Sequence, residues 1–147
     1  YPLKEELEVL DGYIYLMKIR YSDGFEINYD IEQSCQSCLV PRLILQPVVE
    51  NSILHGLLEK VPKGGTIVIT GWLEDNEAVI LISDDGVGMD AGKISGILSG
   101  RGTSKNGTNI GVFNTHRRLE ILYGPGYGLT YNSLLGKGTE VEIRIFA

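Results

Sequence analysis

The chain has 147 residues, of which 43% are hydrophobic and 22% are charged, as expected for one globular domain that buries a real core. Its formal net charge is −6, so the basic surplus that nucleic-acid binding requires is missing, whereas a nucleotide whose phosphates are neutralised by Mg²⁺ and backbone N–H groups remains compatible. No apolar run approaches the roughly 20 residues of a transmembrane helix, and no signal-peptide pattern begins the chain.

The first half of the chain predicts a helix, a strand and a second helix. Residues 2–21 carry apolar side chains at helical spacing, namely Leu7, Leu10, Ile14, Met17 and Tyr21. Residues 25–31 alternate between apolar and polar side chains, which predicts a strand. Residues 41–58 predict the second helix, and Pro47 within it indicates a kink or a restart near Gln46.

The second half predicts a hairpin, a lid-like loop, a third long helix and a closing hairpin. Residues 66–75 and 77–85 form two strands joined at Asn76. A short helix is expected at 90–99, and the glycine-rich residues 100–109 indicate a lid. The long helix, 110–124, is expected to turn Val112, Leu119 and Leu122 to the core, with Phe113 and Ile121 flanking them. The closing strands are 127–133 and 138–146, with Gly136 and Gly138 at their turn.

This order of elements predicts an α/β (α+β) two-layer sandwich. Its sheet is expected to be mixed and mostly antiparallel, with the helices on one face. The whole chain is expected to form a single structural domain.

The connector before the second helix contains Cys35 and Cys38 in the sequence "SCQSC". Two reduced thiols are the simplest interpretation. A redox pair or half of a zinc site is the alternative, and zinc would need further ligands, for which the chain offers only His55 and His116 as histidines.

The second helix carries polar residues in an otherwise apolar stretch. Asn51 and His55 are one turn apart on the same face, with Glu50 beside them. An amide oxygen and a carboxylate are good ligands for Mg²⁺. The alternative is that Glu50 and Asn51 only cap the helix or face solvent.

The sequence "SDDGVGMD" places two carboxylates where a buried strand ends. Asp84 and Asp85 point to opposite faces, so only one of them can line a pocket under the helices. A carboxylate there can accept a hydrogen bond from an exocyclic amino group such as that of adenine, and Gly86 and Gly88 would let the backbone pass close to the base. A strand-ending surface turn is the alternative.

Two further glycine motifs follow. Gly107 precedes a helix in "GTNIGVFN", so free N–H groups and the positive end of the helix dipole can face phosphate. The motif is neither a Walker A loop nor a dinucleotide-binding fingerprint. In "GKGTEVEI", Thr139 offers a hydroxyl at the start of the last strand, and a plain hairpin turn is the alternative.

Taken in this order, the motifs resemble the GHKL (Bergerat) ATP-binding superfamily, and within it the ATP-binding domain of LytS/YesM-type bacterial sensor histidine kinases. "LILQPVVENSILHG" resembles the N box of that type, and the upstream "PLKEELEVLDGYIYLMKIRYSDGFEI" resembles the segment that precedes it. The resemblance implies a Bergerat fold in which residues 1–24 lead into an ATP-binding catalytic domain at 25–147, with its lid at about 99–109.

The resemblance also implies binding of ATP with Mg²⁺. Asn51 would bind Mg²⁺, with a general-base or water-positioning role for Glu50, and Asp85 would bond the adenine amino group. The remaining residues that the resemblance assigns to the nucleotide site are His55, Gly86, Gly88, Met89, Gly107, Ile110, Gly111 and Thr139.

Three positions depart from the family pattern. Leu54 replaces a frequent lysine, which removes a phosphate contact or leaves it to another basic group. Asn109 stands where a glycine is usual, which affects lid geometry. Pro47 stands four residues before Asn51, where the ATPase branch has a catalytic glutamate, so fast ATP hydrolysis is not expected.

The implied function is transfer of the γ-phosphoryl group of ATP to a histidine upstream of this chain, which starts at Tyr1 without a methionine and is expected to be a fragment. Neither His55 nor His116 is expected to be the acceptor. The implied partners are an upstream dimerisation and phosphoacceptor domain and a response regulator, without nucleic acid or membrane contact. The domain is expected to be cytoplasmic, in a parent protein of the bacterial inner or plasma membrane.

Two alternatives to a histidine kinase domain remain open. The fold can persist as a protein-interaction module after nucleotide binding has decayed, and Leu54 and Asn109 favour that reading. An anti-sigma-type serine kinase of the same superfamily would phosphorylate a separate protein and would need no upstream histidine.

Overall fold

The computed structural model describes residues 1–21, 24–60, 62, 64–100 and 108–146. A five-stranded sheet has the order β1-β2-β3-β5-β4, in which β1 is parallel to β2 and the other neighbours are antiparallel. The strands are β1 (Phe25–Ile31), β2 (Gly65–Glu74), β3 (Glu77–Asp84), β4 (Thr130–Leu134) and β5 (Gly138–Phe146). The predicted mixed, mostly antiparallel sheet is therefore confirmed.

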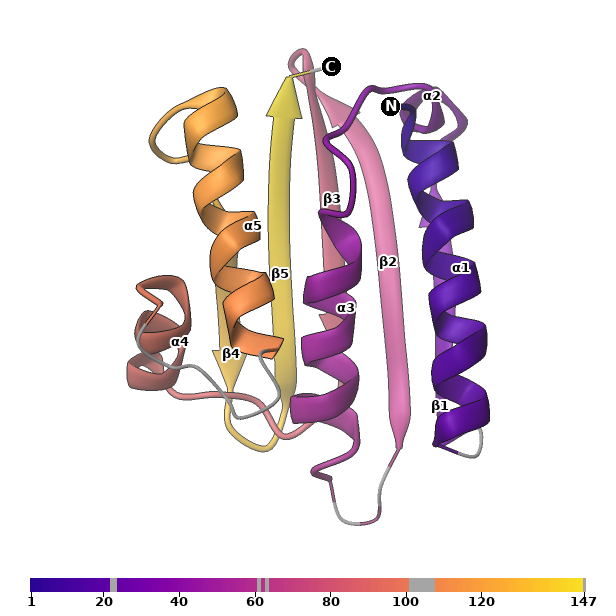
Figure 1. Ribbon diagram of the computed structural model, residues 1–147, viewed down its shortest axis with the longest axis vertical. Coiled ribbons are helices and arrows are strands. Elements are labelled where there is room, and N and C mark those ends of the chain that lie inside the picture. The colour runs from indigo at the N-terminus through magenta and orange to yellow at the C-terminus, as the bar shows by residue number, and fades with distance from the viewer. Residues whose placement is uncertain (22–23, 61, 63, 101–107, 147) are drawn as a thin grey trace.

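The helices form the second layer. Three long helices lie side by side over one face of the sheet in Figure 1, in the order α1, α3 and α5. The helices are α1 (Leu3–Arg20), α2 (Gln33–Gln36), α3 (Leu45–Ser52), α4 (Ala91–Leu98) and α5 (Thr108–Tyr123). Among the described residues, no helix is both long and apolar enough to cross a membrane.

The core lies between the two layers because alternate strand residues face the helices. On β3, Ala78, Ile80 and Ile82 are fully buried there, and Asp84 continues the same alternation at the end of the strand. The opposite face of the sheet is mostly polar, but Val79 is also fully buried on it. Its cross-strand partners on this face are Trp72 and Arg144.

Helix α1 buries the predicted stripe, since Leu10, Ile14 and Met17 belong to the core. An acidic residue, Glu6, is buried on the same face, which the sequence pattern did not predict. Its carboxylate accepts hydrogen bonds from the backbone N–H groups of three consecutive residues, Leu43, Ile44 and Leu45, at 3.1, 3.1 and 3.4 Å. Glu6 thus satisfies donors at the start of α3 that have no partner within their own helix.

Helix α3 begins at Leu45, so the prediction that it starts at Pro41 was wrong by one turn. Residues 41–44 form no helix, so the helix begins beside Gln46 and does not restart there. Leu43, two residues before the helix, has a positive φ of 58°, which is not a helical conformation. Pro47 lies in the first turn, where a missing N–H costs no hydrogen bond, so it produces no kink. After Ser52 the helix continues as a π-helical turn, η1 (Ile53–Leu57), a feature that often marks functional sites.

The two hairpins follow the predicted turns. Asp75 and Asn76 both have positive φ, as a two-residue turn between β2 and β3 requires. On α5, Val112 and Leu119 are buried as predicted, but Leu122 is exposed. The prediction for Leu122 was wrong because Tyr123 packs on the core at the end of the helix and leaves its neighbour on the outer side.

Candidate functional site

The π-helical turn after α3 meets the turn after β3 through two glycines. A Cβ on Gly86 would lie 2.5 Å from the carbonyl carbon of Gly56, and a Cβ on Gly56 would lie 3.1 Å from Asp84 Oδ1. The N–H of Val87 donates to the Gly56 carbonyl oxygen at 3.2 Å. Gly86 therefore makes room for the backbone of another protein segment, whereas the sequence analysis expected it to make room for a base.

Gly88 has the same kind of role on the other side of the turn. Its φ is +75°, and an added Cβ would collide with the backbone of Leu134 in the β4–β5 hairpin. The N–H of Gly136 donates to the Val87 carbonyl oxygen at 2.7 Å, which fixes that hairpin against the turn. Gly86 and Gly88 thus allow three segments to pack closely: the π-helical turn η1, the turn after β3 and the β4–β5 hairpin.

The structure reverses the assignment of the two aspartates. Asp84 is only 9% exposed and lines a pocket beneath α3, together with Asn51 and Ser52. The Asp85 side chain is 55% exposed and lies on the other face, where its Oδ1 accepts from the Thr66 N–H at 2.8 Å and lies 3.8 Å from Lys60 Nζ. The prediction that Asp85 lines the pocket was wrong, because strand alternation puts Asp84 in phase with the core residues of β3.

The Asp84 carboxylate is buried and well hydrogen-bonded. Its Oδ1 accepts from the Gly86 N–H at 2.9 Å. Burial raises the pKa of Asp84, and hydrogen bonds from Gly86, the Ser52 side chain and the Thr139 backbone act in the opposite direction. A buried carboxylate with spare acceptor capacity can select a ligand that donates a hydrogen bond.

Two polar atoms in the same pocket lack partners among the described residues. They are Asn51 Oδ1 and His55 Nε2, both buried. The other ring nitrogen of His55, Nδ1, lies 3.4 Å from Glu59 Oε1. Since buried polar atoms are usually satisfied, these two atoms are available to a water molecule or to a ligand at the pocket.

Ser133 organises the far wall of the pocket. Its hydroxyl accepts from the Met89 N–H at 2.8 Å, donates to the Gly138 carbonyl oxygen at 2.9 Å and lies 2.8 Å from Thr139 Oγ1. Met89 and Thr139, both predicted site residues, thereby line the pocket with Asp84. The volume of this pocket is about 10 Å³, about the least that can hold one water molecule.

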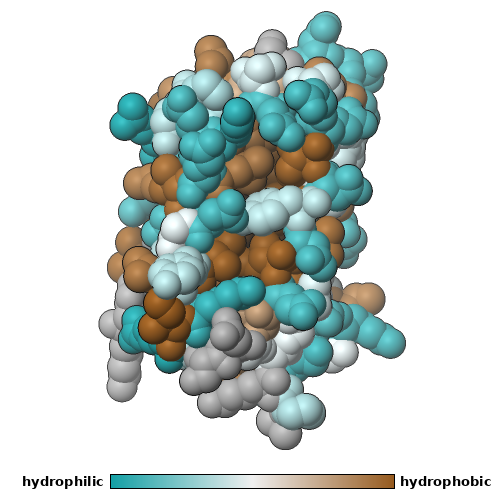
Figure 2. Space-filling model, turned by 90° about the vertical axis from the view of Figure 1, so that its right-hand side faces the viewer, coloured by the Kyte–Doolittle hydropathy of each residue, from teal (hydrophilic) through white to brown (hydrophobic). Residues whose placement is uncertain are grey.

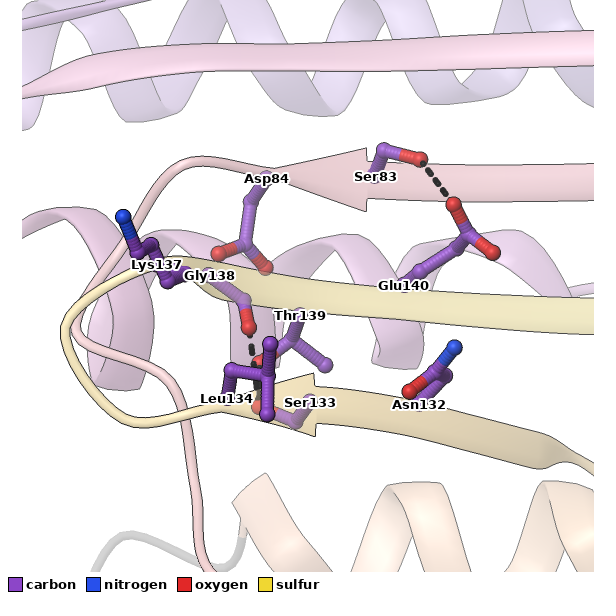
Figure 3. Close-up of a pocket in the computed structure, with 9 residues that line it drawn as sticks. All are labelled: Ser83, Asp84, Asn132, Ser133, Leu134, Lys137, Gly138, Thr139 and Glu140. Carbon is purple, nitrogen blue, oxygen red and sulfur yellow. Dashed lines mark hydrogen bonds between the residues drawn. The ribbon is translucent and has the colours of Figure 1, made fainter.

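A larger hollow adjoins this pocket at the ends of β3, β5 and β4. Its volume is about 220 Å³, and it shares Asp84 and Thr139 with the small pocket. Figure 3 shows its other walls, including the Ser83–Glu140 hydrogen bond of 3.5 Å and the Ser133 contacts. The hollow is open to solvent and extends onto the polar face of the sheet, so the small pocket is the better candidate site.

Glu50 lies outside this pocket. The Tyr13 hydroxyl donates to Glu50 Oε2 at 2.8 Å, so the carboxylate faces α1. Burial and the Glu50 carboxylate raise the pKa of Tyr13. The structure therefore does not bring Glu50 together with Asn51, although the two are neighbours in sequence.

Of the residues predicted to lie near the phosphates of the nucleotide, the structure describes Ile110 and Gly111. Gly111 lies against α3, where an added Cβ would be 3.4 Å from Pro47 Cβ, an ordinary van der Waals contact. Ile110 is exposed at the start of α5. Gly107 and most of the predicted lid lie outside the described residues.

In the part of the chain that the structure describes, the two histidines and the two cysteines build no metal site. Among the residues that the structure describes, no three His, Cys, Asp or Glu side chains are grouped to hold a metal ion. His116 Nδ1 accepts from the Leu129 N–H at 2.9 Å and so has a structural role, and Cys35 and Cys38 are free thiols. A Mg²⁺ ion would thus depend on the unpartnered Asn51 Oδ1 and on oxygen atoms of a ligand.

The sequence analysis did not single out Ser52, Gly56 or Ser133, nor Tyr131 near Asp84, and it gave the pocket role to Asp85 in place of Asp84. The Tyr131 hydroxyl is buried without a partner among the described residues, and burial and the Asp84 charge raise its pKa. The period of β3 could have identified Asp84, since it continues the row of Ile80 and Ile82. Ser52, Gly56, Ser133 and Tyr131 come near the pocket only through tertiary packing, which leaves no local sequence pattern.

Comparison with known proteins gives a consistent result. A family model described as "Histidine kinase-, DNA gyrase B-, and HSP90-like ATPase" matches residues 39–147. The chain is 32% identical over 143 residues to sensor histidine kinase YesM of Bacillus subtilis (strain 168), covering 97% of this chain and 23% of that protein. It is 33% identical over 144 residues to sensor histidine kinase YpdA of Escherichia coli (strain K12), covering 97% and 24%.

A solved structure shows the same fold. The blue-light activated histidine kinase EL346 of Erythrobacter litoralis superimposes with a TM-score of 0.62 at 18% identity, covering 99% of this chain and 42% of that chain. The chain spans about a quarter of the length of the curated relatives that it matches.

Proposed function

Because this chain belongs to the histidine kinase-, DNA gyrase B- and HSP90-like ATPase family, with sensor histidine kinases among its relatives, we propose that it is the ATP-binding catalytic domain of a two-component sensor histidine kinase. The domain would bind Mg-ATP and donate the γ-phosphoryl group to a histidine elsewhere in the parent kinase. The single observation that carries the proposal is the pocket that unites Asp84 with the unpartnered atoms Asn51 Oδ1 and His55 Nε2.

Asp84 is the residue we assign to adenine. Its buried carboxylate would accept a hydrogen bond from the exocyclic amino group, and guanine, which has a carbonyl oxygen at that position, would be rejected. Thr139 and Met89 line the same pocket and would contact the base. Since the volume of the pocket is only about 10 Å³, binding requires the surrounding side chains to move outward.

Asn51 is the residue we assign to Mg²⁺, because its Oδ1 is an oxygen donor that the described residues leave unpartnered. When bound, Mg²⁺ would neutralise charge on the transferring phosphoryl group. His55 Nε2 would bind the phosphate side, a contact that Leu54 cannot make in place of the usual lysine. Phosphoryl transfer would then rest on positioning, with no base needed from Glu50.

The wider organisation is part of the same proposal. Residues 25–147 would form the catalytic domain, and residues 1–24 would lead into it. A dimerisation and phosphoacceptor segment of the parent and a response regulator would be its protein partners. The domain would work in the cytoplasm as part of a membrane-anchored bacterial kinase.

Calorimetric titration of the chain with a non-hydrolysable ATP analogue, with and without Mg²⁺ and with GTP as the control, tests the proposal. We expect saturable, adenine-selective binding that is stronger with Mg²⁺, and an Asn51→Ala variant that keeps its fold but loses most of the Mg²⁺ effect. Absence of binding at millimolar nucleotide would favour the interaction-module alternative. Binding by the chain with transfer to a separate serine-containing protein would favour the serine-kinase alternative.

A further inference from the structure

The two cysteines lie together in a short helical turn that the proposed nucleotide site does not use. Helix α2 contains Cys35 and ends at Gln36, and Cys38 follows two residues later. The Cys38 N–H donates to the Cys35 carbonyl oxygen at 3.1 Å, and both side chains are free thiols. In Figure 1, α2 lies at the upper end of the molecule beside the start of α1, whereas the β4–β5 hairpin lies at the lower end.

The backbone already holds the two residues at a separation that suits a disulfide. A hydrogen bond from an N–H to the carbonyl oxygen three residues earlier closes a turn whose end Cα atoms lie within about 7 Å. Disulfide-bonded cysteines have Cα atoms roughly 4.4–6.8 Å apart. The two thiols are also neighbours, since a hydrogen bond with the Cys38 side chain acts on the Cys35 thiol. A disulfide can therefore close without unfolding of the turn.

The two thiols differ in their access to solvent. Cys35 is fully buried, and its Sγ lies 3.9 Å from the Trp72 carbonyl oxygen. Cys38 is only partly buried, and Ser34 and Ser37 beside the pair are exposed. Figure 2 looks onto the side of the molecule formed by α1 and β1, and the surface at its upper end is mostly hydrophilic. A polar reagent can thus reach Cys38 directly and Cys35 only by way of Cys38.

We propose that Cys35 and Cys38 are a modification site, at which a small-molecule disulfide of the glutathione class converts the dithiol reversibly into an intramolecular disulfide. This inference goes beyond the proposed nucleotide function and does not depend on it.

The reaction proceeds by two exchange steps. The Cys38 thiolate attacks one sulfur of the reagent, which forms a mixed disulfide and releases the first reagent thiol. The Cys35 thiolate then attacks the Cys38 sulfur, so that the protein disulfide forms and the second reagent thiol leaves. The two protein thiols lose two electrons and two protons in all, and the reagent disulfide takes them up as it becomes two thiols.

The surroundings of Cys35 favour a lasting disulfide over the active site of a dithiol oxidant. Burial, and after it the neighbouring Cys38 thiol, raises the pKa of Cys35 to about 11. Strongly oxidising dithiol pairs have a reduced form that is stabilised by a thiolate of lowered pKa. Cys35 lacks that stabilisation, so the pair accepts oxidation and does not pass it on. Few Cys35 thiols are ionised at neutral pH, so the second exchange step is slow.

The pair also lies where the start of α1 is attached to the rest of the fold. The Cys38 carbonyl oxygen accepts from the Leu3 N–H at 2.8 Å, and the Val40 N–H donates to the Tyr1 carbonyl oxygen at 2.7 Å. A disulfide across the turn restricts the unfolded chain and leaves these hydrogen bonds in place. Oxidation should therefore stabilise this attachment, and the fold should in turn favour the disulfide.

Equilibration of the chain with mixtures of reduced and oxidised glutathione, followed by alkylation of free thiols and mass spectrometry, tests the proposal. The chain has no other cysteine, so the result refers to this pair. We expect a species that is two hydrogen atoms lighter, takes up no alkylating group and returns to the dithiol on reduction. Its formation constant should be at least about tenfold larger for the folded chain than for the chain in denaturing urea. A folded chain that keeps both thiols, ends mainly as a mixed disulfide, or has no larger constant than the unfolded chain overturns the proposal.

Single variants test the order of the two steps. Cys35→Ser should stop at the mixed disulfide on Cys38, whereas Cys38→Ser should leave the buried Cys35 at least about tenfold slower to react with oxidised glutathione. Equal rates for the two variants would contradict this order. Hydrogen exchange of the wild type measures the effect on α1, and the Leu3 amide should exchange more slowly in the oxidised chain. Unchanged or faster exchange at Leu3 would contradict the stabilised attachment.

Discussion

The Tyr13 hydroxyl donates a hydrogen bond to Glu50 Oε2 at 2.8 Å and so links α1 to the end of α3, one residue before Asn51. The Glu6 carboxylate holds the beginning of the same helix through the backbone of Leu43, Ile44 and Leu45. The N-terminal helix is therefore attached to both ends of the helix that carries the proposed Mg²⁺ ligand.

Tyr13→Phe should lower the free energy of unfolding by about 1 kcal/mol, because it removes one partly buried hydrogen bond to a carboxylate. Urea denaturation measures this, and Tyr15→Phe on the exposed side of α1 is the matched control. The pKa of Tyr13 is raised above its ordinary 10.0, so the hydroxyl contributes stability below pH 10 that is lost as the pH rises toward its folded pKa. Equal stabilities of the two variants would contradict the link.

Glu6→Ala should cost more, about 3 kcal/mol, because it leaves up to three backbone N–H groups at the start of α3 without an acceptor. Glu5→Ala, one residue away but exposed, should change stability by less than about 0.5 kcal/mol. Thermal and urea unfolding of both variants gives the comparison. A similar small effect of both would show that Glu6 acts only as a helix-start residue.

Asp84→Asn should weaken ATP binding without lowering the free energy of unfolding at neutral pH. We expect ATP binding to weaken about 100-fold, because the pocket acceptor is partly replaced by a donor, whereas Asp85→Asn should change it little. Calorimetric titration of both variants shows which aspartate contacts the nucleotide. A larger effect of Asp85→Asn would favour Asp85 as the residue that bonds adenine.

The same substitution should also change the pH dependence of folding. The pKa of Asp84 is raised above its ordinary 3.8, so the wild type loses stability as the pH rises from 3.8 through the folded pKa. Asp84→Asn lacks this loss and should be at least as stable as the wild type at neutral pH. Urea unfolding at a series of pH values checks this expectation, and a variant that is less stable at neutral pH contradicts it.

Gly86→Ala and Gly12→Ala should have opposite effects. The first places a Cβ 2.5 Å from the Gly56 backbone, so we expect a loss of more than about 3 kcal/mol. The second fills open space in a helix interior and should gain about 1 kcal/mol. Urea unfolding of both variants measures these changes. A tolerated Gly86→Ala would mean that the three closely packed segments can relax.

Periodicity was sufficient to predict most of the fold. The apolar stripe of α1, the alternation of β1 and the turn residue Asn76 are local signals, and the structure confirms them. The start of α3 could not be predicted in this way, because its first donors are satisfied by Glu6, nearly 40 residues earlier in the chain. A long-range cap leaves no local pattern.

The site was predicted in outline but not in its contacts. The sequence indicated that one of two aspartates faces the helices, and the alternation of β3, which puts Asp84 in phase with Ile80 and Ile82, identifies this one as Asp84. Gly86 and Gly88 were expected to make room for a base, whereas the structure shows the backbones of Gly56 and Leu134 at these two positions, an approach that no sequence spacing reveals. Ser133 lies beside the site because the β4–β5 hairpin packs against the turn after β3, where the Ser133 hydroxyl accepts from the Met89 N–H.

The parallel pairing of β1 with β2 has a consequence for how the chain folds. β2 and β3 are joined by a two-residue turn, whereas β1 reaches β2 only after the chain has passed through residues 32–64. Contacts that close long loops form late, so we expect the β2–β3 hairpin to form early and the N-terminal strand to join last. The α1–β1 unit is then the first part to open, and hydrogen exchange should be faster in β1 than in β3.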